Sequence, residues 1–325
     1  MILVVSYPED DHTTAVVERL LADGREVALL DVATLSTSSS LELEYASGSA
    51  STVLVTAGAS VDLSRASSGW WRRLRGVLPD PAVVDPSAFG FVQSETAEVF
   101  EGVIAASEAD WINPPAADTR AQHKPLQWRV AADVGLAVPR TIVTRDPDRA
   151  TAFVAELGIG HVVTKAFLAR ADAWRETHRL EAADVDRLDQ VRFAPTILQE
   201  YVPGVDYRVT MVDGRAFAAE IDATATSHPA DMRMVLGEAQ VRAAVLPDAV
   251  IVALDRLMHA LGLVYGAIDL RRTPDGDYVF FEVNPAGLWL FAEERTGLPI
   301  TAAVADALAR RDGMREAATD GRVVA

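Results

Sequence analysis

Short apolar runs and longer amphipathic stretches alternate through the first part of the chain. Residues 1–7, MILVVSY, form an apolar run typical of a strand, and residues 13–22 place apolar side chains at helical spacing before Gly24 ends the helix. Apolar runs at residues 26–30 and 52–56 predict two more strands. This order of strand, helix and strand indicates an α/β layer.

A polar stretch and an aromatic cluster complete the first unit. Residues 36–51 are rich in serine and predict a polar connection. Residues 69–75, GWWRRLR, contain two indoles, and a helix or loop that packs Trp70 and Trp71 against the core explains them better than a peptide-binding site does. We expect a first domain over residues 1–113.

Paired prolines mark the start of a second unit in the segment INPP, which begins at Ile112. The pattern then predicts a helix over residues 125–134, a second helix over 148–157 and a strand over 161–165. We expect a central subdomain over residues 114–195.

Two β-hairpins are predicted in the last part of the chain. Their strands cover residues 207–211 with 215–221, and residues 266–271 with 278–283. Helical spacing predicts helices at residues 249–261 and 300–310. These elements form an expected C-terminal subdomain over residues 196–325, so the predicted class is α/β (α+β) in three units.

Oxygen-bearing side chains interrupt the apolar strands of the second hairpin. Asp269 lies in its first strand; Glu282 and Asn284 lie two apart in its second strand, so both point to one face and pairing can bring Asp269 beside them. Clustered carboxylates need a compensating cation or proton, and hard oxygen ligands suit Mg²⁺ shared with nucleotide phosphates. A solvated hairpin face is the simpler alternative. Pro285 and Gly287 follow at once and other parts of an ATP site precede the hairpin, so we predict three magnesium ligands.

Two lysines, Lys124 and Lys165, and the end of one strand resemble the other parts of a nucleotide site. Exposure to solvent explains either lysine alone, but together they can neutralise phosphates. After the strand in ILQEYVPGVDYRV, a hinge backbone can bind an adenine edge while Asp206 reaches ribose hydroxyls; exposed loop carboxylates are the alternative for Glu200 and Asp206. The predicted nucleotide contacts are Lys124, Lys165, Gln199, Glu200, Tyr201, Val202 and Asp206.

Two arginines are candidates for the catalytic step. The guanidinium forks of Arg208 and Arg233 fit a phosphate or carboxylate, as a ligase that orients an acyl phosphate requires. Ion pairs with Asp222 or Asp231 are the structural alternative.

Composition narrows the function classes. The 325 residues contain 47 acidic and 30 basic side chains, a net charge of -17, which disfavours a nucleic-acid binder, although solubility explains the charge itself. Cysteine is absent, so a disulfide framework, a thiolate metal site and a cysteine nucleophile are excluded. Neither a membrane span nor a signal peptide is predicted, and we expect a cytoplasmic protein.

The order Lys124, Lys165, QEYV, DYR, Asp269 and EVN resembles the ATP-grasp superfamily over essentially the whole chain. The segments GWWRRL, INPP, APTILQEYV, DMR, YGAIDLRRTPDGDYVFFEVNPAGLW and TGLPI resemble the graspetide synthetases, which crosslink side chains of microviridin-like peptides. The resemblance implies an N-terminal α/β pre-ATP-grasp domain, a central subdomain and a C-terminal ATP-grasp subdomain, with ATP and Mg²⁺ between the last two.

The same resemblance implies a reaction and partners. ATP would phosphorylate an Asp or Glu side chain of a ribosomal precursor peptide with a leader and a core. A Thr or Ser hydroxyl, or a Lys amine, would then form an ester or amide ring. A homodimer is implied as well.

One departure keeps other functions open. Many ATP-grasp enzymes cover the phosphates with a glycine-rich loop, but this chain has no glycine from His161 to Pro203. A loop between Phe167 and Arg179 can take that role; its Thr177 and His178 could contact substrate, but exposed loop residues explain them better. The alternatives are a ligase for an amino acid or small molecule and a pseudo-ligase without turnover.

Overall fold

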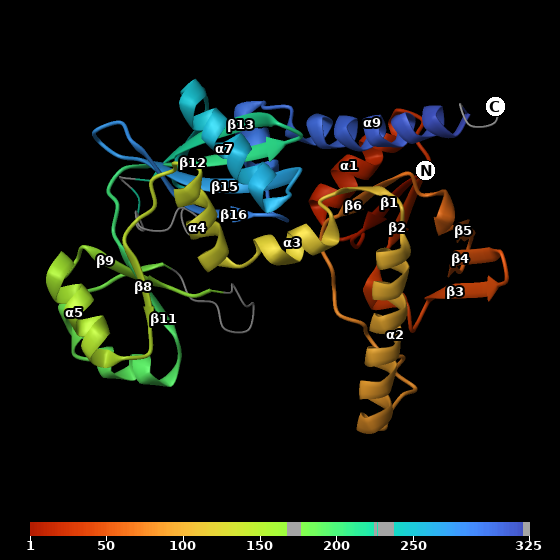
Figure 1. The fold of residues 1–325 in the computed structure, drawn as a ribbon, viewed down its shortest axis with the longest axis horizontal. Helices are drawn as coiled ribbons and strands as arrows, with labels where there is room; N and C mark the ends of the chain where they lie inside the picture. The colour runs from red at the N-terminus through yellow and green to blue at the C-terminus, as the bar shows by residue number, and fades with distance from the viewer. Residues whose placement is uncertain (168–176, 224–225, 227–236, 321–325) are drawn as a thin grey trace.

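The computed structural model describes residues 1–167, 177–223, 226 and 237–320, and their strands form four sheets. The first unit stands apart from the other two in Figure 1, joined to them through α3 (Pro115–Ala121) and α9 (Ile300–Asp320). Among the described residues, no helix has the length and apolar character needed to cross a bilayer.

A parallel sheet forms the centre of the first unit. Its strands are, in spatial order, β2 (Val27–Leu30), β1 (Ile2–Val5), β6 (Ser68–Trp71) and β7 (Asp110–Ile112). Helix α1 (Asp11–Ala22) begins at Asp10, whose carboxylate accepts from the Thr13 amide at 3.0 Å. The α/β layer predicted for the start of the chain is therefore present.

Both faces of this sheet are covered. Ile2 and Val4 pack in one apolar cluster with α1 and α9, whereas Leu3 and Val5 pack in another with α2 (Pro86–Ala106). A strand that is buried on both faces carries no polar alternation, which explains its continuous apolar run.

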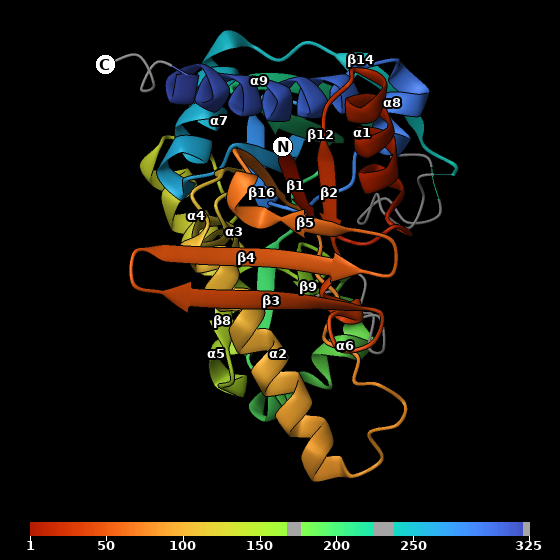
Figure 2. The same cartoon turned by 90° about the vertical axis from the view of Figure 1, so that its right-hand side faces the viewer.

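Two predictions for this unit are corrected. The serine-rich stretch is not a connection: an antiparallel sheet forms from β3 (Ser39–Ala46), β4 (Ser49–Thr56) and β5 (Ser60–Asp62), whose long strands β3 and β4 cross the front of the molecule in Figure 2. Its Leu41 and Leu43 pack against the core, and all eight residues of β3 pair with β4.

The aromatic cluster forms a strand instead of a helix or loop. Trp70 and Trp71 lie in β6 and point to opposite faces of the sheet. Trp70 packs near Trp289, at 6.2 Å between ring centroids, and Trp71 stacks on Phe100 at 5.9 Å. The expected packing of both indoles in the core is confirmed.

The central unit is an antiparallel sheet with helices on one face. Its strands are, in spatial order, β10 (His178–Arg179), β9 (Val162–Lys165), β11 (Thr196–Glu200) and β8 (Thr141–Thr144). Helix α5 (Pro147–Leu157) packs on it, with α6 (Ala182–Val185) and η3 (Leu188–Phe193) nearby. Because β11 pairs with both β8 and β9, the predicted boundary before Thr196 comes too early.

The C-terminal unit is an antiparallel sheet that contains both predicted hairpins. Its strands are, in spatial order, β14 (Gln240–Ala244), β13 (Arg215–Asp222), β12 (Val205–Val212), β15 (Tyr265–Arg272) and β16 (Tyr278–Asn284). Helices α7 (Asp248–Leu261) and α4 (Lys124–Asp133) share its apolar core. The segment predicted to open the central unit therefore packs on the last one.

The C-terminal helix ties the first and last units together. After α8 (Leu290–Thr296), α9 packs with α1 and with Val212 and Tyr265 of the C-terminal sheet. Arg311 of α9 also pairs with Asp213 at 2.8 Å. Arg311 also lies 3.4 Å from Asp110 of β7, so this side chain links the first unit to the β12–β13 turn of the C-terminal sheet.

Candidate active site

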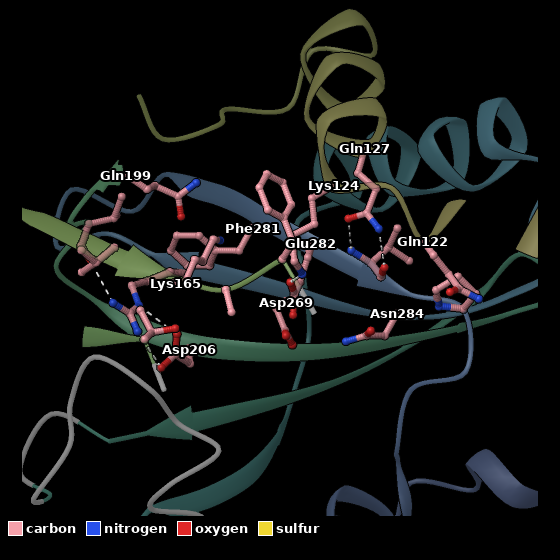
Figure 3. A pocket seen from close by; sticks show the side chains of 18 of the residues that line it. Gln122, Lys124, Gln127, Lys165, Gln199, Asp206, Asp269, Phe281, Glu282 and Asn284 are labelled. Carbon is pink, nitrogen blue, oxygen red and sulfur yellow. Dashed lines mark hydrogen bonds and ion pairs between the residues drawn. The ribbon is translucent and has the colours of Figure 1, made fainter. Parts of the chain in front are cut away.

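A cavity of about 390 Å³ lies between the central and C-terminal sheets (Figure 3). Ten of the predicted residues line it: Lys124, Lys165, Gln199, Glu200, Tyr201, Val202, Asp206, Asp269, Glu282 and Asn284. Arg208 adjoins it through Asp269, and Arg233 lies outside the described residues. The fold therefore gathers residues from segments more than a hundred positions apart.

Two carboxylates meet where the second hairpin pairs. Asp269 of β15 is the register partner of Glu282 on β16, and Asn284 lies further along the same strand opposite Ala267. A β-bulge follows Asp269, so the additional residue Phe281 lines the cavity next to Glu282. The predicted convergence of these side chains on one face agrees with the register.

Each carboxylate contacts a basic side chain. Lys124 Nζ donates to Glu282 Oε2, and Arg208 Nε lies 2.9 Å from Asp269 Oδ1, across the β12–β15 register. Asp269, the partner of Arg208, was not one of the acids predicted as its structural partners, which were Asp222 and Asp231. The basic groups compensate two neighbouring negative charges in a partly closed site.

The donor chemistry fits Mg²⁺. In the part of the chain that the structure describes, no cluster of three or more His, Cys, Asp or Glu side chains is found. Two carboxylates and one amide are suited to an ion that also takes phosphate oxygens and water, whereas a cage of protein ligands alone is not formed.

Hydrogen bonds hold the wall of the cavity that is predicted to contact the nucleotide. Both oxygens of Asp206 accept from Arg271, at 2.8 and 2.9 Å, and Arg271 also donates to the Val202 carbonyl at 2.9 Å. Gln199 donates to Thr141 Oγ1 at 2.8 Å. Asp206 is thus a rigid part of the hinge, and its contact with ribose stays a prediction.

Lys165, at the end of β9, lies near Asp206 in the cavity (Figure 3). Its Nζ is 5.7 Å from the Trp128 ring centroid and 5.8 Å from that of Phe281. The aromatic faces restrict the ammonium to the cavity, where a point charge can act on phosphates.

The expected phosphate-covering loop falls largely outside the described residues, at 168–176. At its ends, Phe167 and Thr177 line the cavity. His178 instead contacts Asp184 at 2.7 Å. Its side chain therefore has a structural partner in the central unit.

Gln127 is a site residue that the sequence did not reveal. From α4 its amide donates to the carbonyls of Ala121 at 2.6 Å and Val283 at 2.8 Å, and its oxygen accepts from the Val283 amide at 3.0 Å. Val283 lies between Glu282 and Asn284 in the strand. By binding the Val283 backbone, Gln127 fixes the position of both predicted ligands relative to α4. A buried glutamine on an otherwise apolar helix face was the only signal.

We expect Gln127→Leu to lower ligase turnover by about 10- to 100-fold and to raise the Mg²⁺ concentration for half-maximal rate, because outer-shell partners hold ligands in place. Steady-state rates across a Mg²⁺ titration measure both. Gln93→Leu is the matched control, since Gln93 also donates to a backbone carbonyl, that of Val77, but far from the cavity. Equal rates in the two variants would contradict the assignment.

The segment after Glu282 and Asn284 is held by the first unit. Arg72 donates to the carbonyls of Ala286 at 2.7 Å and Gly287 at 3.0 Å, and Tyr265 Oη donates to the latter at 2.8 Å. A Cβ at Gly287 would lie 2.3 Å from the Ala267 side chain, so only glycine permits this packing.

His12 accepts two hydrogen bonds from the same segment. The amides of Trp289 and Leu290 donate to its Nε2 at 2.9 and 3.2 Å, so the ring must be neutral there. Burial, followed by the neighbouring charge of Arg72, lowers the pKa of His12 to about 4.

We expect the free energy of unfolding to fall as the pH drops from about 6.5 toward 4, because the unfolded chain binds a proton at His12 that the folded chain refuses. The lowered pKa of His12 corresponds to a loss on the order of 3 kcal/mol in the free energy of unfolding once the pH is below 4. Urea titrations of the wild type and His12→Gln at pH 7 and pH 5 measure it. Gln retains an acceptor, so the variant should lose less stability between the two pH values; identical losses would exclude His12 as the source.

Comparisons with known proteins agree with this fold. Residues 1–119 match the family model of the MvdD pre-ATP grasp domain. A comparison with curated protein sequences returned no match. The confirmed fold class is thus an ATP-grasp ligase architecture with a pre-ATP-grasp domain.

Three solved structures are similar over almost the whole chain. Macrocyclase MdnC from Microcystis aeruginosa MRC, bound with precursor peptide MdnA, has a TM-score of 0.85 and 28% identity over 95% of this chain and 99% of its own. Macrocyclase MdnB from the same organism gives 0.79 and 27% over 94% and 98%. ATP-grasp ligase PsnB, complexed with a phosphomimetic variant of its minimal precursor, Mg and ADP, gives 0.77 and 26% over 95% and 98%.

Proposed function

Since the chain is an ATP-grasp ligase of the graspetide synthetase family, we propose that it is an ATP- and Mg²⁺-dependent macrocyclase of a ribosomal precursor peptide. It phosphorylates Asp or Glu side chains of the core and joins them to Thr or Ser hydroxyls as esters, or to Lys amines as amides. The leader of the same peptide binds elsewhere on the enzyme.

The paired carboxylates carry this proposal. Asp269 and Glu282 lie opposite each other in a cavity that Lys124 and Lys165 also line. Such an arrangement of two acids and two cations matches a Mg²⁺-nucleotide triphosphate, whose phosphates need positive charge and whose metal needs oxygen. With Asn284, the two acids would hold the ion; when bound, it would neutralise charge on the transferred phosphoryl group.

The chain's own residues supply positioning. A carboxylate is a poor electrophile, and phosphorylation gives it a leaving group. Arg208, fixed by Asp269, is near enough to the acidic pair to act on an acyl phosphate, as the lysines act on the triphosphate. On this ground we propose Arg208 as a catalytic residue. Arg233 lies outside the described residues, and we propose it as a second one on the chemistry of its guanidinium alone. No covalent enzyme nucleophile is needed.

The proposal is tested by mass spectrometry of the peptide encoded beside this gene, after incubation with the protein, ATP and Mg²⁺. We expect loss of one water for each link, absent when ATP is omitted. An unmodified peptide, together with ADP formation from ATP when a small amino acid is added, would instead favour a small-molecule ligase. Nucleotide binding without any turnover would favour a pseudo-ligase.

We also propose that two copies associate through α2 and the loop before it. Large apolar side chains are exposed there: Leu74, Leu78, Val84, Phe89, Phe91 and Val99. In Figure 1, α2 projects beyond the sheet of its own unit. Exposed large apolar side chains that gather on one helix and its preceding loop mark this part of the chain as a candidate interaction surface. Since the reaction consumes ATP, we place it in the cytoplasm.

We expect Phe91→Glu to convert dimers to monomers in analytical ultracentrifugation, because it places a charge in the proposed interface. Tyr45→Glu, at an exposed aromatic residue on β3, is the control and should leave the mass unchanged. A wild-type protein that sediments as a monomer at micromolar concentration would sink the proposal.

A further inference from the structure

Three arginines follow the indoles of β6, and they differ in what they contact. Arg72 is buried, with Nε 3.1 Å from Asp10 Oδ2. Arg75 lies 3.2 Å from Glu9 and pairs with Asp31. For the half-buried Arg73, the described part of the chain provides no hydrogen bond or ion pair.

Arg73 lines the active-site cavity instead. It is the only cavity-lining residue that the described part of the first unit contributes, since the others come from the central and C-terminal units. Its neighbour Arg72 holds the carbonyls of Ala286 and Gly287, so Arg73 enters beside the end of β16. Pro285 and Ala286 line the cavity there as well.

This position lies beyond the predicted metal ligands. Glu282, Asn284 and then Ala286 follow one another along the cavity wall. With the nucleotide hinge at Tyr201 and Val202 and phosphates at the acidic pair, the space past Asn284 is where an acceptor for the terminal phosphate must stand. An attacking atom needs to be within about 3.5 Å of that phosphorus.

We infer that Arg73 binds the peptide carboxylate that is to be phosphorylated, and then the acyl phosphate formed from it. The inference rests on the proposed function. A carboxylate oxygen forms a bond to the terminal phosphorus, the bond from that phosphorus to the bridging oxygen breaks, and ADP leaves with the electron pair. The hydroxyl or amine then attacks the acyl carbon, loses its proton, and phosphate departs.

The chemistry of the guanidinium matches this task. The fork offers two parallel N–H groups to a carboxylate or phosphate. A net charge of -17 repels an acidic peptide core, so a local cation without an acidic partner of its own gives the carboxylate a reason to enter. Arg72 cannot serve, because its charge is directed to Asp10 and buried.

The test compares Arg73→Gln and Arg73→Lys with Arg75→Gln, a matched arginine of the same run that does not line the cavity. With the precursor peptide, ATP and Mg²⁺, hydroxylamine traps the acyl phosphate as a hydroxamate. We expect Arg73→Gln to raise the KM for peptide by at least about tenfold, the effect of one charge-assisted hydrogen bond. The Kd of Mg·ADP and that of Mg with the nonhydrolysable ATP analogue AMPPNP should not change. Arg73→Lys should fall between.

A binding arm separates this inference from the proposed function. Acetylphosphonate, a stable mimic of an acyl phosphate, is titrated into Mg·ADP-loaded protein and followed by phosphorus NMR. Weaker binding in Arg73→Gln but not in Arg75→Gln supports the site even if no peptide is modified, an outcome that would count against the macrocyclase alone. The assignment would be overturned if acetylphosphonate bound all variants equally or did not bind the wild type. It would also be overturned if Arg73→Gln lost affinity for AMPPNP but not for ADP.

Discussion

Glu282→Gln and Asp269→Asn should each lower ligase turnover by at least about 100-fold, because each removes one of two charges that would hold the metal and through it the transferred phosphate. The two acids are register partners on adjacent strands, so neither can be replaced by the other without moving the backbone. Their amide replacements keep size and hydrogen bonding but lose the charge.

The two variants should differ in stability. Lys124 is partly exposed and can turn into the cavity when Glu282 loses its charge. Arg208 is buried and pairs with Asp269, so Asp269→Asn leaves a cation without its counter-ion. Thermal unfolding should therefore be lowered more in Asp269→Asn than in Glu282→Gln.

Hydroxamate formation and Mg²⁺-dependent ADP binding measure the effect. The control is Glu156→Gln, an exposed acid that pairs with Arg140 outside the cavity. Retained turnover in Glu282→Gln, with a normal Mg²⁺ requirement, would refute the metal assignment.

The largest effect on stability is expected from Arg72→Met. Burial works to raise the pKa of Asp10, but Arg72 and Thr13 outweigh it and hold that pKa below its ordinary value. Methionine would leave the Asp10 carboxylate buried without its cation, and would also free the carbonyls of Ala286 and Gly287. A loss of about 3–5 kcal/mol in the free energy of unfolding is typical of a broken buried pair.

Arg75→Met is the matched control. Arg75 is more exposed than Arg72 and pairs with Glu9 and Asp31, so its removal should cost about 1 kcal/mol or less. Urea unfolding followed by tryptophan fluorescence compares them, since Trp70 and Trp289 flank the Arg72 guanidinium. Equal losses in both variants would mean that the contact between the first unit and the β16 segment contributes little.

Local pattern was sufficient for the elements that carry their own signal. The second hairpin followed from apolar strands flanking turn residues, and its interruption by Asp269, Glu282 and Asn284 pointed to oxygen chemistry before any contact was known. Period-2 geometry made their shared face predictable.

The same local reasoning failed where packing decides. Helix α2 was not predicted, although Asp85 caps it and Pro86 opens it, because its apolar residues face both the core and the surface. Strand β3 was missed although Leu41, Leu43 and Tyr45 alternate with two glutamates, because the serines on both sides of this short run made the whole segment look like a connection. The predicted domain boundary before Thr196 was misplaced because the sequence of a strand does not show which other strands it pairs with.

The sequence by itself determined which acids, lysines and hinge residues were candidates for the site and their order along the chain, but it did not point to Gln127 or Arg73. Only the tertiary structure decided which charges meet. Arg208 with Asp269, Lys124 with Glu282, Arg271 with Asp206 and Gln127 with Val283 all join residues distant in the chain. The physical reason is that an ion pair or hydrogen bond acts over a few ångströms, and sequence separation says nothing about that distance until the sheets have formed and packed.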